Sequence, residues 1–374
     1  MNQNLITILR LLYNKFFKKI KLITTNLNVI YIKTIYTFIS IFYSRIKSMH
    51  KKILWLDYVR AIACCMVVLL HTAAEYVLKS EGVNWNFANL VDSFTRVCVP
   101  LFFMISGYLF FSEKSVKIKN FIKIITALLF YSTIAFFAAI TFHIIQPNIP
   151  IDFKILSQPS FYHLWYFYPL IAIYLLSAII QIRNIKFITS LTIFIIFFIL
   201  FNPKINNYTQ LFNFRIDNYF YIQGDFLFFV LYGLLGASFR NFQPKKTLPY
   251  LYLTTYILCS LFIAYLTYLT SHNKTWPFYS YSTPLVFLAA FSLFSFIKTK
   301  ELELKENSFI TIISKNSLGI YGIHAFILYA ISYFTHFYKY SVFIFLPIIF
   351  LVVLTSSLIF SLILKKIDKK GYIT

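Results

Sequence analysis

The sequence predicts an all-α polytopic membrane protein with about ten transmembrane helices and both termini in the cytoplasm. Two features of the composition carry this prediction: 59% of the 374 residues are apolar, and only 13% are charged. A soluble domain holds about a quarter charged residues, so a water-soluble globule is excluded, as is a disordered chain. Long apolar segments in lipid must satisfy their backbone hydrogen bonds internally, which favours helices.

The apolar residues are gathered into segments of membrane-spanning length. About 20 apolar residues are needed to cross the hydrocarbon core. After residue 50, ten candidate segments lie at about 54–78, 93–112, 121–145, 163–181, 186–201, 224–239, 248–270, 281–297, 316–337 and 341–364. The fifth and sixth segments are short. No soluble domain fits in the connections between them, and the Asn-rich connection 202–222 is expected to pack on the membrane surface.

The basic residues set the orientation of the segments. The chain has 35 Lys and Arg against 12 Asp and Glu, a net charge of +23. With ten spans, 19 of the cations fall on the side that holds both ends of the segment 51–374, and only six on the other, namely Lys79, Lys154, Lys204, Arg215, Lys274 and Lys339. Cytoplasmic loops carry the excess of Lys and Arg, so both termini are predicted to be cytoplasmic. Topology explains most of the positive charge, and nucleic acid is not expected as a partner.

The N-terminal region differs from the rest of the chain. Residues 1–50 hold eight Lys and Arg and no acidic residue. We therefore divide the chain into a basic extension, 1–48, and a membrane domain, 49–374. The extension is interpreted either as an amphipathic or single-spanning segment on an anionic lipid surface, or as a consequence of a start assigned too early, with translation beginning at Met49. It has no small-residue cleavage site of the kind that ends a signal peptide.

The first span carries a polar stripe. Eleven residues at about 100° each place Arg60 and His71 within about 20° of the same helix face. Asp57 and Glu75 fall on that face as well, so the stripe is roughly 27 Å long. Charged residues inside a bilayer are costly and indicate function. Asp57 is interpreted as an i,i+3 ion pair with Arg60; His71 is either a helix-packing residue or, given its aligned partners, a residue that transfers protons.

The second span repeats the pattern with Asp92 and Arg96. Because this span runs from outside to inside, Arg96 is expected near the depth of His71 and Glu75. Glu75 and Arg96 are therefore interpreted either as a structural ion pair between two helices or as contacts to substrate. Pro100 and the Ser106-Gly107 pair are expected to allow a kink or a close helix approach.

Other candidate residues lie in later spans. His163 opens the fourth span and is interpreted either as part of an acceptor site or as an ordinary interfacial residue, and Trp165 as an interface anchor. Tyr321 and His324 lie three apart on one face of the ninth span, where they either line the same cavity as His71 or make helix-packing hydrogen bonds. Asp225 is interpreted as a helix cap. The four cysteines, all within apolar runs, are expected in the core, and no metal site is expected.

Several motifs resemble those of one family. The Arg60–His71 spacing, Arg96 and the ten spans resemble the integral-membrane acyltransferase family 3, as do the stretches Pro100–Gly107, Phe161–Phe167, Leu231–Gly236 and Ser314–His324. The resemblance covers about residues 53–368. The third span lacks the Arg-x-Arg motif with which many members bind the acyl donor.

The resemblance implies an O-acyltransferase of the bacterial inner (cytoplasmic) membrane. Its expected co-substrate is acetyl-CoA, with no bound cofactor, and its expected acceptor is a hydroxyl of a cell-envelope glycan. Carried over to this chain, the essential histidine is His71 and its paired arginine is Arg60. The remaining candidates, assigned to substrate binding, are Glu75, Arg96, His163, Tyr321 and His324.

The residues leave the route of transfer open. His71 either takes the proton from the acceptor hydroxyl or carries the acetyl group itself. Arg60 lies about 16 Å along the helix from His71, so an extended donor has to reach between them. The sequence also leaves two other classes of protein open. A polysaccharide exporter or flippase without acyl-transfer chemistry would favour broken helices or internal symmetry, and a structural or signalling protein leaves the intramembrane Arg60 and His71 without a role.

Overall fold

The structure is a computed structural model that describes residues 53–111, 116–145, 158–180, 187–216, 220–245, 247–271 and 275–374. Within these ranges all regular structure is helical, which confirms the all-α prediction. The extension 1–48 lies outside the described residues. The long helices are α3 (Leu54–Lys79), α6 (Ile118–Ile145), α11 (Pro249–Thr270), α12 (Pro284–Thr299), α13 (Ser308–Thr335) and α14 (Val342–Ile367). The shorter α-helices are α4 (Gly82–Thr95), α5 (Cys98–Phe110), α7 (Phe167–Leu176), α8 (Phe187–Ile199), α9 (Asn206–Thr209) and α10 (Phe226–Ser238). Short 3₁₀ turns lie at Tyr162–Tyr166, Pro203–Ile205, Gln210–Phe212, Pro277–Tyr279 and Phe337–Lys339.

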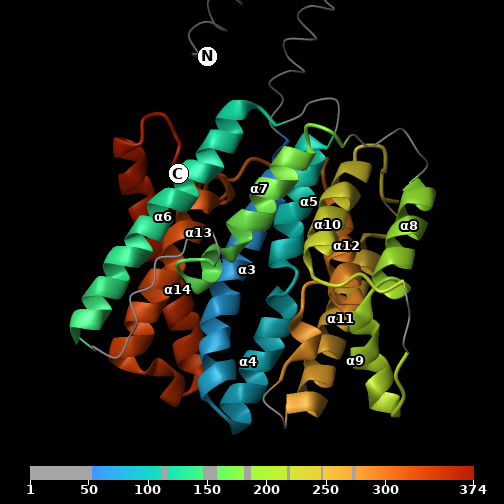
Figure 1. Cartoon of the computed structure of the whole chain (residues 1–374), viewed down its shortest axis with the longest axis horizontal. Coiled ribbons are helices and arrows are strands. Elements are labelled where there is room, and N and C mark those ends of the chain that lie inside the picture. Colours follow the sequence, from blue (N-terminus) through green and yellow to red (C-terminus); the bar gives the residue numbers. More distant parts are fainter. Residues whose placement is uncertain are drawn as a thin grey trace, which may run out of the picture. The chain divides into compact units, whose positions relative to one another are not determined.

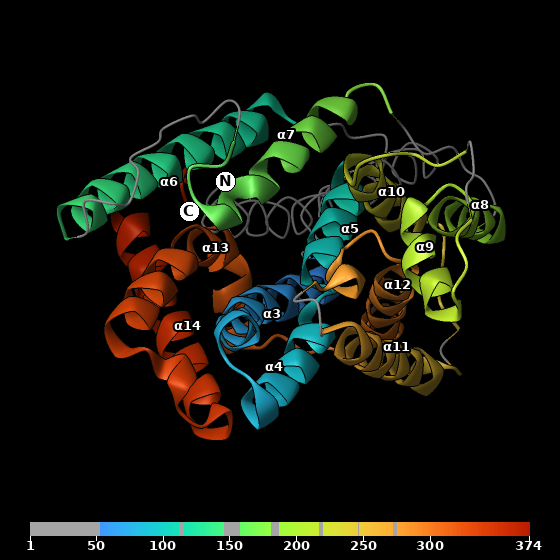
Figure 2. The same ribbon diagram turned by 60° about the horizontal axis from the view of Figure 1, so that its bottom comes forward.

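Helix α3 lies at the centre of the bundle. It packs against α4, α5, α12, α13 and α14, and Figure 2 shows it enclosed by its neighbours. Its buried positions include small residues, Ala61, Ala63, Cys64 and Ala73. Small side chains allow helices to approach closely where lipid supplies no hydrophobic drive for their association. The helix that carries the predicted polar stripe is therefore surrounded by protein.

Helices α6 and α14 lie at the edge of the bundle (Figure 1). Both expose large apolar side chains, among them Ile122, Leu129 and Phe137 on α6 and Phe343, Ile348 and Leu351 on α14. A contiguous apolar surface of this kind is unfavourable in water. These faces are suited to contact with lipid.

Helices α4 and α5 form one broken span, Gly82–Phe110. The break falls at Arg96 and Val97, and Pro100 lies four residues after Arg96. A proline has no N–H, and its ring collides with the carbonyl group of the residue four positions earlier. Pro100 therefore ends the regular hydrogen bonding at Arg96, as the sequence led us to expect.

Helices α5 and α10 touch through their backbones. A Cβ atom added at Gly107 would overlap the carbonyl group of Gly233, and one added at Gly236 would overlap that of Met104. The close approach expected from the Ser106-Gly107 pair is confirmed, and its partner surface is supplied by two glycines of α10. This contact holds α5 against α10 on the side of α3 away from α14 (Figure 2).

The predicted count of ten spans is not confirmed. Each of the ten predicted segments contains a helix, but in the described residues only seven helices are long and apolar enough to cross a membrane. An eighth span results if α8 and the segment Pro203–Phe212, bent by 63° relative to each other, form one. The remaining two, α7 and α10, have 10 and 13 residues. At 1.5 Å per residue they extend about 15 and 20 Å, less than the hydrocarbon core.

The connection 202–222 begins with short helical turns. Its first residue, Asn202, is buried and donates hydrogen bonds to the carbonyl groups of Phe198 and Ser282, at 3.1 and 2.7 Å. Asn207 donates to the carbonyl group of Pro277 at 3.3 Å. Two asparagine amides thus attach this connection to the segment before α12.

Candidate functional site

His71 lies near the middle of α3 and is partly buried. Its ring centre lies 5.2 Å from those of Tyr162 and His324. The ring of His163 in turn lies 5.2 Å from that of His324. The structure thus brings together three histidines that are far apart in the sequence. Of the sequence-predicted site residues, His163, Tyr321 and His324 are the ones that lie beside His71.

His163 and His324 are held by backbone carbonyl groups. Nε2 of His163 lies 3.2 Å from the carbonyl oxygen of Gly322. Nδ1 of His324 lies 2.7 Å from the carbonyl oxygen of Tyr321, and 3.2 Å from that of Ile320. The two side chains are almost completely buried, with exposed fractions of 1% and 0%. Both rings are therefore fixed in place.

Tyr321 links the same elements. Its hydroxyl group donates a hydrogen bond to the carbonyl oxygen of His163. Its ring lies 5.5 Å from the rings of His163 and Tyr166. Tyr321 therefore attaches the short turn Tyr162–Tyr166 to α13.

A small cavity of about 10 Å³ adjoins His71. That volume is room for about one water-sized group. Its lining residues come from α3, α5, α13, the turn Tyr162–Tyr166 and the segment before α12: Val67, Leu70, His71, Cys98, Val99, His163, Trp165, Tyr166, Tyr281 and Tyr321. Trp165, expected as an interface anchor, lies in this wall and stacks on Tyr281 with ring centres 5.8 Å apart.

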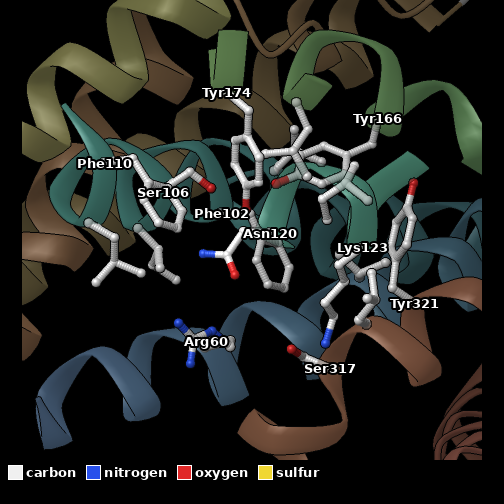
Figure 3. A pocket seen from close by; sticks show the side chains of 17 residues that line it. Arg60, Phe102, Ser106, Phe110, Asn120, Lys123, Tyr166, Tyr174, Ser317 and Tyr321 are labelled. Atoms are coloured by element: carbon white, nitrogen blue, oxygen red, sulfur yellow. The ribbon is translucent and has the colours of Figure 1, made fainter. Parts of the chain in front are cut away.

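A second cavity, of about 240 Å³, opens beside Arg60. Figure 3 shows the side chains of Arg60, Asn120 and Lys123 around this space together with the rings of Tyr166, Tyr174 and Tyr321. Most of the remaining wall is apolar and comes from α3, α5, α6, α7 and α13: Val67, Val99, Phe102, Ile105, Leu109, Phe110, Ile124, Leu170 and Leu318. Two cations therefore face an otherwise apolar space.

The two cavities adjoin each other. Val67, Val99, Tyr166 and Tyr321 line both. The four side chains form the partition between the space at Arg60 and the space at His71. The site therefore runs along α3 from a guanidinium group to an imidazole, with two aromatic and two valine side chains between them.

Arg60 forms the ion pair expected from its spacing to Asp57. Its guanidinium lies 3.2 Å from the Asp57 carboxylate and 3.3 Å from the hydroxyl group of Ser314. The Ser314 hydroxyl donates to the same carboxylate at 2.7 Å. The Arg60 side chain still exposes 28% of its surface. The pair orients the guanidinium on the cavity wall and leaves part of it accessible.

Lys123 is a cavity residue that the sequence reasoning missed. It was counted only as a cytoplasmic cation, because it stands at the end of a Lys-rich loop. In the structure it belongs to the second turn of α6, lines the cavity and donates a hydrogen bond to the carbonyl oxygen of Thr374 at 2.5 Å. The sequence offers no signal that distinguishes it from the neighbouring loop cations.

Of the two interpretations of Glu75 and Arg96, the ion pair between them is wrong. Glu75 pairs with Lys79 at 2.6 Å and accepts a hydrogen bond from Ser332. Arg96 pairs with Asp92 at 2.5 Å on its own helix, and its guanidinium lies over the ring of Tyr279, 4.1 Å from the centre. Each charge is thus neutralised one helical turn away, where a partner needs no second helix to be placed.

Three further expectations concern Asp225, the cysteines and metal binding. Asp225 stands at the N-cap position of α10, but its carboxylate accepts from the hydroxyl group of Ser282 at 2.6 Å and not from the first turn of the helix. Cys64, Cys98 and Cys259 are buried, as expected, and Cys65 is partly buried. Within the described ranges, no group of three His, Cys, Asp or Glu side chains is arranged to hold a metal ion.

Comparison with known proteins gives one family. A family profile described as an acyltransferase domain, acyltransferase 3, matches residues 53–365. A serine/alanine racemase of Enterococcus gallinarum is 34% identical over 130 residues, which is 31% of this chain and 18% of that protein. The match thus spans less than a fifth of the racemase. No solved structure is significantly similar to the chain. The family profile covers most of the membrane domain, including Arg60, His71, Lys123, His163, Tyr321 and His324, and the chain therefore belongs to the acyltransferase 3 family.

Proposed function

We propose that the protein is an O-acetyltransferase of the bacterial inner membrane. It moves an acetyl group from acetyl-CoA to a hydroxyl of a cell-envelope polysaccharide or of its lipid-linked precursor. The observation that supports this proposal is the pair of adjoining cavities along α3, with Arg60 and Lys123 on the larger and His71 on the smaller. Family membership supports acyl transfer over polysaccharide export.

The larger cavity suits the acyl donor. CoA carries phosphate groups at one end and an acylated thiol at the other. Arg binds phosphate through a planar set of donors, and Lys binds it as a point charge. Lys123 of α6 stands in for the Arg-x-Arg motif that this span lacks. The apolar wall between the cations and the partition accommodates the arm that carries the thiol.

The smaller cavity suits the reacting groups. The thioester carbonyl passes the partition of Val67, Val99, Tyr166 and Tyr321 and reaches His71, about 16 Å along the helix from Arg60. A neutral imidazole is a suitable base near pH 7. His71 takes the proton of the acceptor hydroxyl as its oxygen attacks the thioester carbon. The C–S bond then breaks, and the proton passes from His71 to the departing thiolate.

The acceptor approaches from the end of α3 that carries Glu75 and Lys79. Tyr162, whose ring lies 5.2 Å from that of His71, is 46% exposed there. A sugar can rest on an exposed aromatic ring and bind the carboxylate of Glu75 or the hydroxyl of Ser332. The motifs of this chain resemble those of the inner-membrane O-acetyltransferase of enterobacterial common antigen, which makes an envelope glycan the first acceptor to test.

The decisive test replaces His71 by alanine in a deletion strain. We expect H71A to abolish O-acetylation of the envelope glycan, measured by NMR of the purified glycan, while the variant remains in the membrane in normal amount. H336N, at an exposed histidine at the end of α13, is the control and should retain activity. Wild-type acetyl content in the H71A strain would contradict the proposal. A glycan that is acetylated normally but not secreted in the deletion strain would favour export.

Labelling of the purified wild-type enzyme separates the two routes of transfer. In the direct route, no covalent enzyme intermediate forms. In the two-step route, a purified enzyme mixed with labelled acetyl-CoA and no acceptor becomes labelled at His71 and releases CoA. Acid quenching followed by peptide mass spectrometry distinguishes the two.

A further inference from the structure

Two buried nitrogens beside His71 have no hydrogen-bond partner. They are Nδ1 of His163 and Nε2 of His324, on side chains that are 1% and 0% exposed. Buried polar atoms in native proteins are nearly always paired, so such an atom requires an explanation. Here two occur in one cluster of three imidazoles.

The backbone contacts assign the hydrogen on each of these rings. A carbonyl oxygen only accepts, so a ring nitrogen that faces one carries the hydrogen. Nε2 of His163 faces the carbonyl group of Gly322, and Nδ1 of His324 faces that of Tyr321. In a neutral imidazole the other nitrogen is then an acceptor. Nδ1 of His163 and Nε2 of His324 are therefore two lone pairs without a donor.

The missing donor has to come from His71 or from a bound molecule. Neither His163 nor His324 can donate to the other, because each uses its N–H on the backbone. His71 makes no hydrogen bond through its ring to any described residue, so its N–H is unassigned. The ring of His71 is thus the protein's own donor beside two acceptors.

The spacing fits a hydrogen bond between His71 and His324. The ring centres are 5.2 Å apart. A ring nitrogen lies about 1.2 Å from the centre of its ring, and a linear hydrogen bond of about 2.9 Å between two such nitrogens therefore separates the centres by about 5.3 Å. Because the second side-chain torsion of histidine is broad, a rotation of the His71 ring aligns the N–H with Nε2.

His163 is placed for a different task. It lines the small cavity together with His71, whereas His324 does not. A molecule in that cavity can donate a hydrogen bond to Nδ1 of His163. The lone pair of His324 is reached from His71 and not from the cavity.

We propose that His324 is a positioning residue: its Nε2 accepts the N–H of His71 and so directs the other nitrogen of His71, with its lone pair, into the small cavity. This inference deepens the acetyltransferase proposed above and rests on it. The bond fixes which tautomer of His71 meets the acceptor hydroxyl. When His71 takes the hydroxyl proton, its second N–H remains bound to His324, and the proton later leaves with the thiolate.

The test compares two conservative variants of His324 in purified enzyme with acetyl-CoA and glycan acceptor. The amide oxygen of H324Q lies near the place of Nε2 and retains an acceptor for His71, whereas the shorter H324N has its polar group near the place of Nδ1. We expect H324N to lower kcat about 100-fold with the KM for acetyl-CoA unchanged, and H324Q to restore kcat to within about tenfold of the wild type. H336N, on the same helix, is the matched control.

The outcomes separate this inference from the proposed function. Equal loss in H324N and H324Q, or a rise in KM without a fall in kcat, would show that His324 only supports packing or binding. Wild-type kcat in H324N would likewise overturn the inference while leaving the acetyltransferase intact. A wild-type enzyme that transfers no acetyl group from acetyl-CoA would overturn the proposed function itself. Thermal unfolding of each variant in detergent identifies a loss that comes from misfolding.

Discussion

At the scale of single residues, the site holds two kinds of polar group. The arginines form ion pairs, whereas two histidine nitrogens have no hydrogen-bond partner in the described part of the chain. Arg60 binds Asp57, and Arg96 binds Asp92 on the same helix. Such pairing offsets part of the cost of burying a charge. The imidazoles of His163 and His324 instead keep a buried lone pair each. Each arginine thus has an ion-pair partner in the resting structure, although Nε of Arg96 has no hydrogen-bond partner among the described residues, whereas the histidine cluster lacks a donor.

Removal of either cavity cation should weaken donor binding. We expect R60A and K123A each to raise the KM for acetyl-CoA about tenfold or more, since a hydrogen bond to a charged group contributes about 1.5–3 kcal/mol. The measurement is steady-state kinetics with acetyl-CoA in reconstituted vesicles. K366A removes an exposed cation at the end of α14 and serves as the control. A KM that stays unchanged in both R60A and K123A would place the donor elsewhere.

At the scale of elements, the contact between α5 and α10 depends on the absence of side chains. A Cβ atom at Gly236 would overlap the backbone of Met104, whereas one at Gly233 would meet the ring of Phe111. A ring can rotate away, but a backbone carbonyl within a helix cannot. The two glycines are three residues apart on one helix, but the neighbouring atoms can move at Gly233 and cannot move at Gly236.

Alanine at these two positions should therefore have unequal effects. We expect G236A to lower the free energy of unfolding by about 1–3 kcal/mol or more through overpacking, and G233A to lower it less. Thermal unfolding of the purified variants in detergent gives the comparison. Equal stability of G236A and the wild type would mean that α5 and α10 are farther apart than described.

The tail after α14 turns back on the carboxylate of Asp368. The backbone N–H groups of Tyr372, Ile373 and Thr374 donate to it at 3.0, 2.7 and 3.2 Å. Burial alone raises the pKa of Asp368, but these backbone hydrogen bonds outweigh it and hold the pKa below its ordinary value. Thr374 in turn accepts the hydrogen bond of Lys123. The turn thus connects the tail to the cavity wall.

Acid should release this tail. Because the pKa of Asp368 is lower in the folded tail than in a released one, the turn is stabilised above about pH 4 and that stabilisation is lost as the pH falls further. We expect amide hydrogen exchange at Tyr372–Thr374, corrected for its intrinsic rate, to accelerate as the pH is lowered from 6 to 3. D368N should exchange fast throughout. Protection in the wild type that does not change over this range would argue against the carboxylate as the anchor.

Much of the helical arrangement was predictable from local patterns, and the limits have physical causes. Apolar segments gave every helix except α9 and most of α4, which begins at Gly82 and not near residue 93. Pro100 gave the break at Arg96, because its effect is confined to one stretch of chain. The lengths of α7, α8 and α10 were overestimated, because apolar composition continues past the residues that remain helical. Of the two partners of Glu75, Lys79 follows from i,i+4 spacing, whereas Ser332 was not predictable, because it comes from α13 and its position depends on packing.

The site was predictable to a similar degree. The alignment of Arg60 with His71 follows from helix geometry alone. The gathering of His163, Tyr321 and His324 around His71 was only one of two open interpretations, since it depends on how three separate elements meet. Lys123 was missed, because a cation at the end of a basic loop has the same sequence signature as a topology signal.

At the scale of the whole molecule, the charges imply an orientation. The loop between α12 and α13 is predicted to be cytoplasmic and the start of α4 to be external, since the cations are concentrated on the first side. The exposed side chains Leu302 and Val83 mark these two places. The orientation determines the side from which the proposed donor arrives.

Cysteine labelling checks this orientation. In a variant without the four native cysteines, we expect V83C to react with a membrane-impermeant maleimide in intact cells and L302C to react only after the membrane is opened. Labelling is read by a mass shift on a gel. The reverse pattern would place Arg60 on the outer side and remove acetyl-CoA as the donor, because CoA is a cytoplasmic compound.

Arg60 and His71 stand on one unbroken helix, so their separation does not change when other helices move. Helix α3 therefore keeps the proposed anion-binding group and the proposed base about 16 Å apart. A donor whose phosphate lies next to its acyl group, such as acetyl phosphate, cannot contact both at once. In the proposed reaction this fixed distance selects donors by length, and we expect small activated acetyl compounds such as acetyl phosphate to be poor substrates even though their chemistry is equally reactive.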